Sequence, residues 1–286
     1  MSSPISFGIT HLTTATSLIR IRNTTFLTDP IFDSSEVTYL YEPTNVTLVK
    51  DHNPAIAIDA LPPIHHILLS HEDHPDNLDH LGRTLLNGRS VLTTPDGHKN
   101  LQPRPGVQAM KPWKSIIVDG PGGDKWKITG TPCIHTPPGE CTGFVLEAAD
   151  GSFGTDPDNG LPRAFWFSGD TILFPELVEG LKKRFKIVCG LVNLGGAKAP
   201  APDGTEFKIT MDGKDAEMLV NAIGMEKLVP IHFTGWKHFR QEMGEMKEQL
   251  EGLGERVVWV VPGVETVVEC RGEERGYDSA ENDDME

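Results

Sequence analysis

The chain has 286 residues and a formal net charge of −15; 38% of its residues are hydrophobic and 23% are charged. This composition is typical of a soluble globular protein, and the length suits one large domain, predicted at residues 1–270. The negative charge disfavours nucleic acid and anionic membranes as partners. No apolar run approaches the ~18 residues of a membrane span, and no signal peptide follows Met1, so a cytoplasmic location is expected. Residues 271–286 are predicted to form an acidic, disordered tail.

The first third of the chain predicts strands followed by a long connection. Short β-prone runs indicate strands at 5–9, 17–21 and 25–28. Residues 31–62 have no clear periodicity, and a connection of that length in a compact domain is usually a lid or a binding loop. A buried strand at 64–70 and a helix at 77–86 follow.

The remainder of the chain alternates strands and helices. Strands are predicted at 125–130, 143–146, 165–167, 187–194, 228–231 and 257–261, and helices at 175–185, 212–223 and 238–253. Thr210 or Asp212 can cap the helix at 212–223. No repeat or linker divides the chain. Strand runs and helices mixed in this way predict an α/β sandwich.

The segment 70–79, Ser-His-Glu-Asp-His-Pro-Asp-Asn-Leu-Asp, places two histidines and four acids directly after an apolar run. Imidazoles and carboxylates gathered at the end of a strand are ligands typical of zinc and related metals. His71, His74 and Asp76 are therefore candidate ligands.

Three further apolar runs end in a possible ligand: one leads to His135, one to Asp170 and one to His232. A sheet brings strand ends together from distant sequence positions, so these side chains are predicted to surround one point with those of the 70–79 segment. A bound divalent ion would lower the pKa of its water from about 15.7 towards 7. Asp76 is then the candidate that orients this water and later delivers its proton. Alternatively, Asp76 caps the helix at 77–86, and Asp170 caps a turn.

The motifs resemble the metallo-β-lactamase superfamily in their order. Segments 8–11 and 27–30 resemble its opening hairpins, in the branch with ascorbate-6-phosphate lactonase and the N-acyl-phosphatidylethanolamine phospholipase. Segment 68–79 stands at the place of the His-x-His-x-Asp-His signature, and segments 131–135, 168–171 and 229–233 match later ligand motifs. The resemblance implies a four-layer αββα sandwich. It also implies that the first metal is held by His71, His74 and His135. Asp170 would bridge the two metals. Asp76 and His232 would belong to the second site.

The chain departs from this signature at two points. One extra residue separates His71 from His74, so that Asp73 becomes the second ligand if the alignment is anchored on His71. Asn77 stands where the last histidine is expected, and an amide is a weak ligand. We therefore predict one firm Zn²⁺ site and a second site that is weak or absent. Mn²⁺ or Fe²⁺ is also compatible with these ligand types.

Residues beyond the last predicted ligand are candidates for substrate contact. Trp236 can form an apolar wall of the pocket or pack in the core, and His238 can hydrogen-bond a substrate carbonyl or a metal ligand, or open a surface helix. Tyr41, in the 31–62 loop, is a further candidate for the pocket. By resemblance only, His11 and Asp29 support the ligands.

The resulting hypothesis is a hydrolase that opens a small cyclic amide, carbamate or lactone. It rests on the likeness of the Ser-His-x-x-His-x-Asp-Asn and His-Phe-x-Gly-Trp motifs to fungal lactamase-like detoxification enzymes. The alternatives are a phosphodiesterase or thioesterase of the same fold, or a metal-binding module without catalysis. The acidic charge balance argues against a nucleic-acid substrate.

Overall fold

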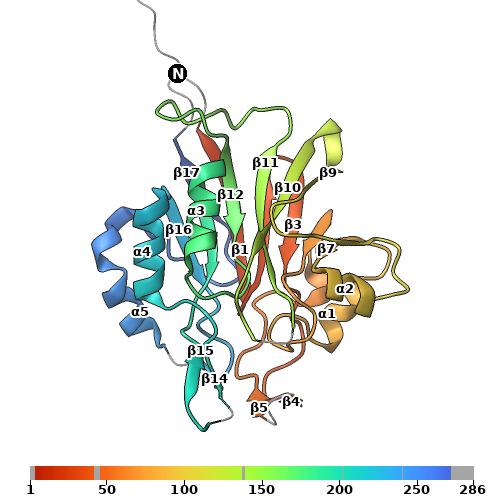
Figure 1. Cartoon of the computed structure of the whole chain (residues 1–286). Coiled ribbons are helices and arrows are strands. Elements are labelled where there is room, and N and C mark those ends of the chain that lie inside the picture. The colour runs from red at the N-terminus through yellow and green to blue at the C-terminus, as the bar shows by residue number, and fades with distance from the viewer. Residues whose placement is uncertain (1–3, 42–45, 137–138, 202, 240, 272–286) are drawn as a thin grey trace, which may run out of the picture.

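Two β-sheets form the centre of the molecule (Figure 1). The computed structural model describes residues 4–41, 46–136, 139–201, 203–239 and 241–271. The first sheet has the strand order β17 (Thr266–Cys270), β1 (Ile5–Thr13), β2 (Thr16–Ile21), β3 (Thr24–Thr28), β6 (His66–Leu68), β7 (Ser90–Thr93) and β8 (Val107–Ala109). The second has the order β16 (Lys227–Ile231), β13 (Lys186–Asn193), β12 (Arg163–Phe167), β11 (Thr142–Ala148), β10 (Lys125–Pro132) and β9 (Ser115–Asp119).

Helices cover the outer face of each sheet, so the predicted four-layer αββα sandwich is confirmed (Figure 1). The helices α1 (His80–Leu85) and α2 (Pro95–Asn100) lie on the side of the first sheet. The helices α3 (Pro175–Arg184), α4 (Gly213–Ile223) and α5 (Met243–Gln249) lie on the side of the second. No helix within the described residues is both long and apolar enough to cross a membrane.

The central strands are apolar on both faces because one face meets the other sheet and the opposite face meets the helices. In β12, Phe165 and Phe167 enter the core between the sheets, whereas Ala164 and Trp166 pack against the helices. Successive side chains of a strand point to opposite faces, and both faces of this strand are covered. Helix α4 begins at its N-cap Asp212, which forms a capping box with Asp215, as one of the two predicted caps.

Strand direction brings several strand ends to one edge. Strands β3, β6, β7 and β8 are parallel, and β12, β13 and β16 are parallel in the second sheet. Strand β10 runs the same way as β12, because each is antiparallel to β11. The hairpins β4 (Thr38–Tyr41)–β5 (Val46–Val49) and β14 (Lys198–Pro200)–β15 (Glu206–Lys208) project at the lower edge in Figure 1.

The predictions for the C-terminal region need correction. Segment 257–261 is not a strand: Val257 forms a single bridge to Leu228, and the strand at the edge of the first sheet, next to β1, is β17. The helix predicted from residue 238 begins only at Met243, because the backbone before it bonds elsewhere, with the Gln241 amide donating to the Gly195 carbonyl. Periodicity does not reveal such tertiary hydrogen bonds.

One further prediction is corrected. The helix predicted at 77–86 is shorter, since α1 begins at His80 after its N-cap Asp79. The 31–62 connection contains the hairpin β4–β5 and the short 3₁₀ helix Ile58–Ala60, and its role as a lid or binding loop stays a prediction. Of the predicted tail, residues 272–286 lie outside the described residues, so the tail remains a prediction.

Candidate metal centre

Each predicted ligand lies just beyond the end of a strand at the common edge. His71 follows β6, His135 follows β10, Asp170 follows β12 and His232 directly follows β16. These strands run in the same direction within their sheets, so the residues after them meet at one edge although they are far apart in sequence. The structure thus brings together the ligand candidates that the sequence identified.

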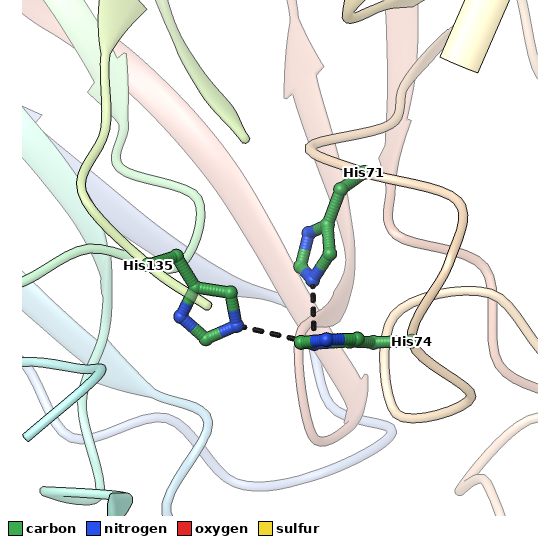
Figure 2. Close-up of side chains that lie close together, drawn as sticks. All are labelled: His71, His74 and His135. Atoms are coloured by element: carbon green, nitrogen blue, oxygen red, sulfur yellow. Dashed lines mark hydrogen bonds between the residues drawn. The ribbon is translucent and has the colours of Figure 1, made fainter. Parts of the chain in front are cut away.

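Three histidine side chains converge on one point, as Figure 2 shows. His74 Nδ1 lies 3.0 Å from His71 Nε2 and 3.1 Å from His135 Nε2. The ligand atoms of the three residues all lie within 4.8 Å of one another. If His74 Nδ1 carries a proton, that one hydrogen is shared between two acceptors; if it does not, its lone pair faces that of His135 Nε2. A cation at this point removes the repulsion between lone pairs.

The outward nitrogens of two of these rings are already hydrogen-bonded. His135 Nδ1 lies 2.7 Å from the Ile209 carbonyl oxygen, which can only accept, so the proton is on Nδ1 and Nε2 points inward as a lone pair. His71 Nδ1 lies 2.8 Å from Ser70 Oγ, and that hydroxyl donates to Asp29 at 2.7 Å. Metal-bound histidines are commonly oriented by such outer contacts.

Asn77 participates in this outer network. Its Nδ2 donates to Asp29 Oδ2 at 3.0 Å, beside the two hydrogen bonds from the Ser70 amide and hydroxyl. Burial raises the pKa of Asp29 to about 8, although these donors favour the carboxylate. Asn77 therefore helps to hold the Asp29 carboxyl group, which is linked to His71 through the Ser70 hydroxyl. Asp29 was suggested by family resemblance alone, and nothing in the sequence indicated its link to Asn77.

A second group of ligand atoms lies next to the three histidines. His232 Nε2 is 3.4 Å from Asp170 Oδ2 and 3.8 Å from Asp76 Oδ2, and His238 Nε2 is 3.1 Å from Asp76 Oδ2. Asp170 Oδ2 also lies 3.7 Å from His135 Nε2, which connects the two groups. Asp170 is held by Asn193, at the end of β13, whose Nδ2 donates to Oδ1 at 2.6 Å.

The two structural alternatives for the carboxylates are not what the structure shows. Asp79, not Asp76, caps α1, with its side chain accepting from the Gly82 amide. Asp170 points its second oxygen at histidines rather than closing a turn. Both carboxylates are thus available to a metal.

Burial sets the charge states that a metal site needs. It lowers the pKa values of His71 and His74 well below the usual 6.5, and neighbouring histidines add to this effect. The rings therefore remain neutral, with lone pairs available for a metal. Burial alone would raise the pKa of Asp76, but the hydrogen bond from His238 and the nearby imidazoles outweigh it and hold that pKa well below its usual range. The donor set of neutral imidazoles and carboxylates fits a zinc-class ion.

Backbone strain coincides with this site. His232 has φ of +65°, and Thr14, whose carbonyl accepts from the His232 amide at 2.9 Å, has φ of +45°. Non-glycine residues seldom adopt this region, and they do so mainly where surrounding contacts hold them for function. His232, with its left-handed backbone, has its ring nitrogen Nε2 next to Asp170 and Asp76.

Other residues suggested by the sequence lie at different places. Asp73, the alternative to His74, is exposed and outside the three-histidine group. Trp236 is buried, and its indole N–H donates to Thr14 Oγ1 at 3.1 Å. It packs beside His238 and does not line the cavity. Tyr41 ends β4, and its side chain lies outside the described residues.

A cavity of about 270 Å³ opens onto both ligand groups. The hairpin β14–β15 supplies Ala199, Pro200 and the charged side chains Lys198 and Glu206, and other apolar contacts come from Leu48, Ala197 and Ile209. The sequence did not mark this hairpin as part of the site. Its short strands carry no ligand-type motif that could have marked it.

The profile of the family described as the beta-lactamase superfamily domain matches residues 24–233. With the fold and the strand-end ligands, this match shows that the chain belongs to the metallo-β-lactamase superfamily, which includes metal-dependent hydrolases.

Several known hydrolases are similar to this chain in sequence or in fold. A metal-dependent hydrolase of Pyrobaculum arsenaticum is 23% identical, over 78% of this chain and 89% of the relative. Igni18, a metallo hydrolase of Ignicoccus hospitalis, shares the fold with a TM-score of 0.67 and 17% identity, over 93% of this chain and all of that one. An isothiocyanate hydrolase from Delia radicum gut bacteria has a TM-score of 0.71 and 16% identity, over 92% of this chain and all of that one.

Proposed function

We propose that this chain is a metal-dependent hydrolase that opens a small cyclic amide, carbamate or lactone. The observation that carries the proposal is the convergence of His71, His74 and His135 on one point, with His74 and His135 lining a cavity whose wall is largely apolar. Such a cavity suits a small, mostly uncharged molecule. The formal charge of −15 disfavours polyanionic substrates.

A divalent ion at this centre would supply an acidic water and polarise a substrate carbonyl. The residues of the chain manage the proton. Asp76 Oδ1 is buried and finds no hydrogen-bond partner among the residues that the structure describes, while Oδ2 contacts His238. Asp76 begins as a carboxylate, since its pKa lies well below the usual range. It can accept a proton at Oδ1 and pass it to the ring nitrogen or oxygen that leaves on opening.

Zinc is the metal we propose, with manganese and iron as the ions to compare. A panel of lactams, lactones, thioesters and phosphodiesters, assayed with each metal, tests the substrate class. Isothiocyanates belong in the panel, because a protein of this fold hydrolyses them and they are small apolar electrophiles. We expect ring opening to exceed phosphodiester cleavage. Turnover confined to phosphodiesters contradicts the proposal.

His135→Ala tests the centre itself. We expect this variant to lose the metal and its turnover while retaining the circular dichroism spectrum of the parent. The matched control is His98→Ala. His98 lies in α2, away from the cavity, and its Nδ1 is likewise 2.9 Å from a backbone carbonyl oxygen, that of Val107. Equal losses in both variants would point to a general loss of folding and not to a metal centre.

A further inference from the structure

The second ligand group has an imidazole that does not come from the family signature. We propose that His238 is a ligand of a second metal ion, in place of the imidazole that Asn77 does not supply. Asp76, Asp170 and His232 would be the other ligands of that ion. The inference rests on the proposed metal-dependent function and extends it to a second ion.

The side chain of His232 indicates a cation in this group. Its Nδ1 lies 3.3 Å from the Leu194 carbonyl oxygen, which can only accept, so the proton is on Nδ1. Nε2 is buried and has no hydrogen-bond partner in the described part of the chain, yet it lies 3.4 Å from Asp170 Oδ2 and 3.8 Å from Asp76 Oδ2. A lone pair facing two carboxylates is repulsive. A divalent ion between them makes all three contacts favourable.

His238 is close enough to bind the same ion. Its Nε2 lies 3.1 Å from Asp76 Oδ2. Two ligands of a tetrahedral zinc ion, with bonds of about 2.0–2.2 Å, lie roughly 3.3–3.6 Å apart, so a small adjustment suffices. His238 Nδ1 has no hydrogen-bond partner among the described residues, so no contact there opposes a lone pair on Nε2.

The loop that carries His238 is well anchored. The Lys237 amide donates to the Val49 carbonyl at 3.1 Å, and Lys50 forms a backbone bridge with Trp236. The Phe239 ring packs against His232 and His238, with ring centroids 4.7 and 4.6 Å away. These contacts hold both histidines towards the carboxylates before any ion binds, which lowers the cost of ordering the ligands.

The amide of Asn77 serves elsewhere, because its Nδ2 donates to Asp29 behind His71. A weak or absent second site is predicted from the sequence because Asn77 stands where the last imidazole is expected. Since His238 does reach Asp76, we now expect a second ion to be held in addition to the first.

Metal titration of the chelator-treated, full-length protein tests this inference without an activity assay. Equilibrium dialysis against Zn²⁺ with elemental analysis should find two ions per chain in the parent. In His238→Ala one ion should remain, with the affinity for the other lowered by more than about 100-fold, beyond the usual loss for an outer contact. His80→Ala is the control, because His80 is an exposed histidine that stacks on Tyr39 outside the cavity. It should bind as the parent does.

A second variant separates a ligand from a hydrogen-bond donor. His238→Asn retains an N–H for Asp76 but provides a poor ligand. If His238 only orients Asp76, the second ion returns in this variant. If His238 binds the ion, the second ion stays weak and the Co²⁺ absorption bands of that site change. A parent that binds a single ion overturns this inference alone, whereas a parent that binds none overturns the proposed function as well.

Discussion

The hydroxyl of Ser70 offers a sharp test of how the first metal site is organised. Ser70 Oγ contacts Asp29 Oδ2 at 2.7 Å and His71 Nδ1 at 2.8 Å, and all three residues are buried, with at most 1% exposed. Ser70→Ala removes both contacts. Asp29 Oδ2 keeps the Asn77 amide as a donor, so the His71 Nδ1 group is the one that loses its close partner, and we expect the metal-free protein to lose about 1–3 kcal/mol of unfolding free energy.

Metal affinity should fall too, because His71 is no longer held in the orientation that points Nε2 inward. Loss of such an outer contact typically weakens metal binding by about 10–100-fold. Competition with a chelator of known affinity measures this change, and urea unfolding measures the stability. Ser17→Ala is the matched control, since the buried Ser17 hydroxyl lies 3.3 Å from Nδ1 of His11, a histidine outside the three-histidine group.

The control should lose stability and retain metal affinity. A Ser70→Ala variant that is destabilised by about 1–3 kcal/mol and still binds metal as tightly as the parent would refute a role of the hydroxyl in the metal site. That result would mean that the fold holds the His71 ring without the hydroxyl.

Three other predictions concern pH and packing. Burial lowers the pKa of His11 from 6.5 to about 4, so the unfolded chain takes up a proton that the folded chain does not. The metal-free protein should therefore lose stability as pH falls from 6.5 to about 4. In His11→Gln, the unfolding free energy measured with urea should fall less steeply over this pH range. Asp29 acts in the opposite sense. Its pKa rises from 3.8 to about 8, which costs stability as pH rises through that interval, and Asp29→Asn should remove this pH-dependent loss of unfolding free energy. In thermal unfolding, Gly82→Ala should destabilise the protein by about 3 kcal/mol, because the added Cβ would lie 1.8 Å from the Pro30 carbonyl oxygen. Gly244→Ala in α5, where the added Cβ meets open space, should stabilise it by about 0.5–1 kcal/mol. Similar effects at both positions would contradict a steric cause.

The layers and the strand ends could be predicted from local pattern. Strand β12 alternates side chains between two covered faces, and apolar runs of this kind are visible without a structure. Ligand-type residues directly after such runs marked His135, Asp170 and His232. The C-terminal elements were less predictable, because Gln241 and Val257 bond to partners far away in sequence.

The sequence by itself determined which residue types stand at the strand ends, since that depends only on short-range pattern. The tertiary structure decided which nitrogen of each histidine points inward, because carbonyl oxygens of Ile209 and Leu194 make that choice and no side chain marks them in the sequence. It also turned Asn77 towards Asp29 and brought His238 to Asp76 through a loop bonded to β5. Such contacts join segments far apart in the chain, and their distances exist only once the sheets have packed.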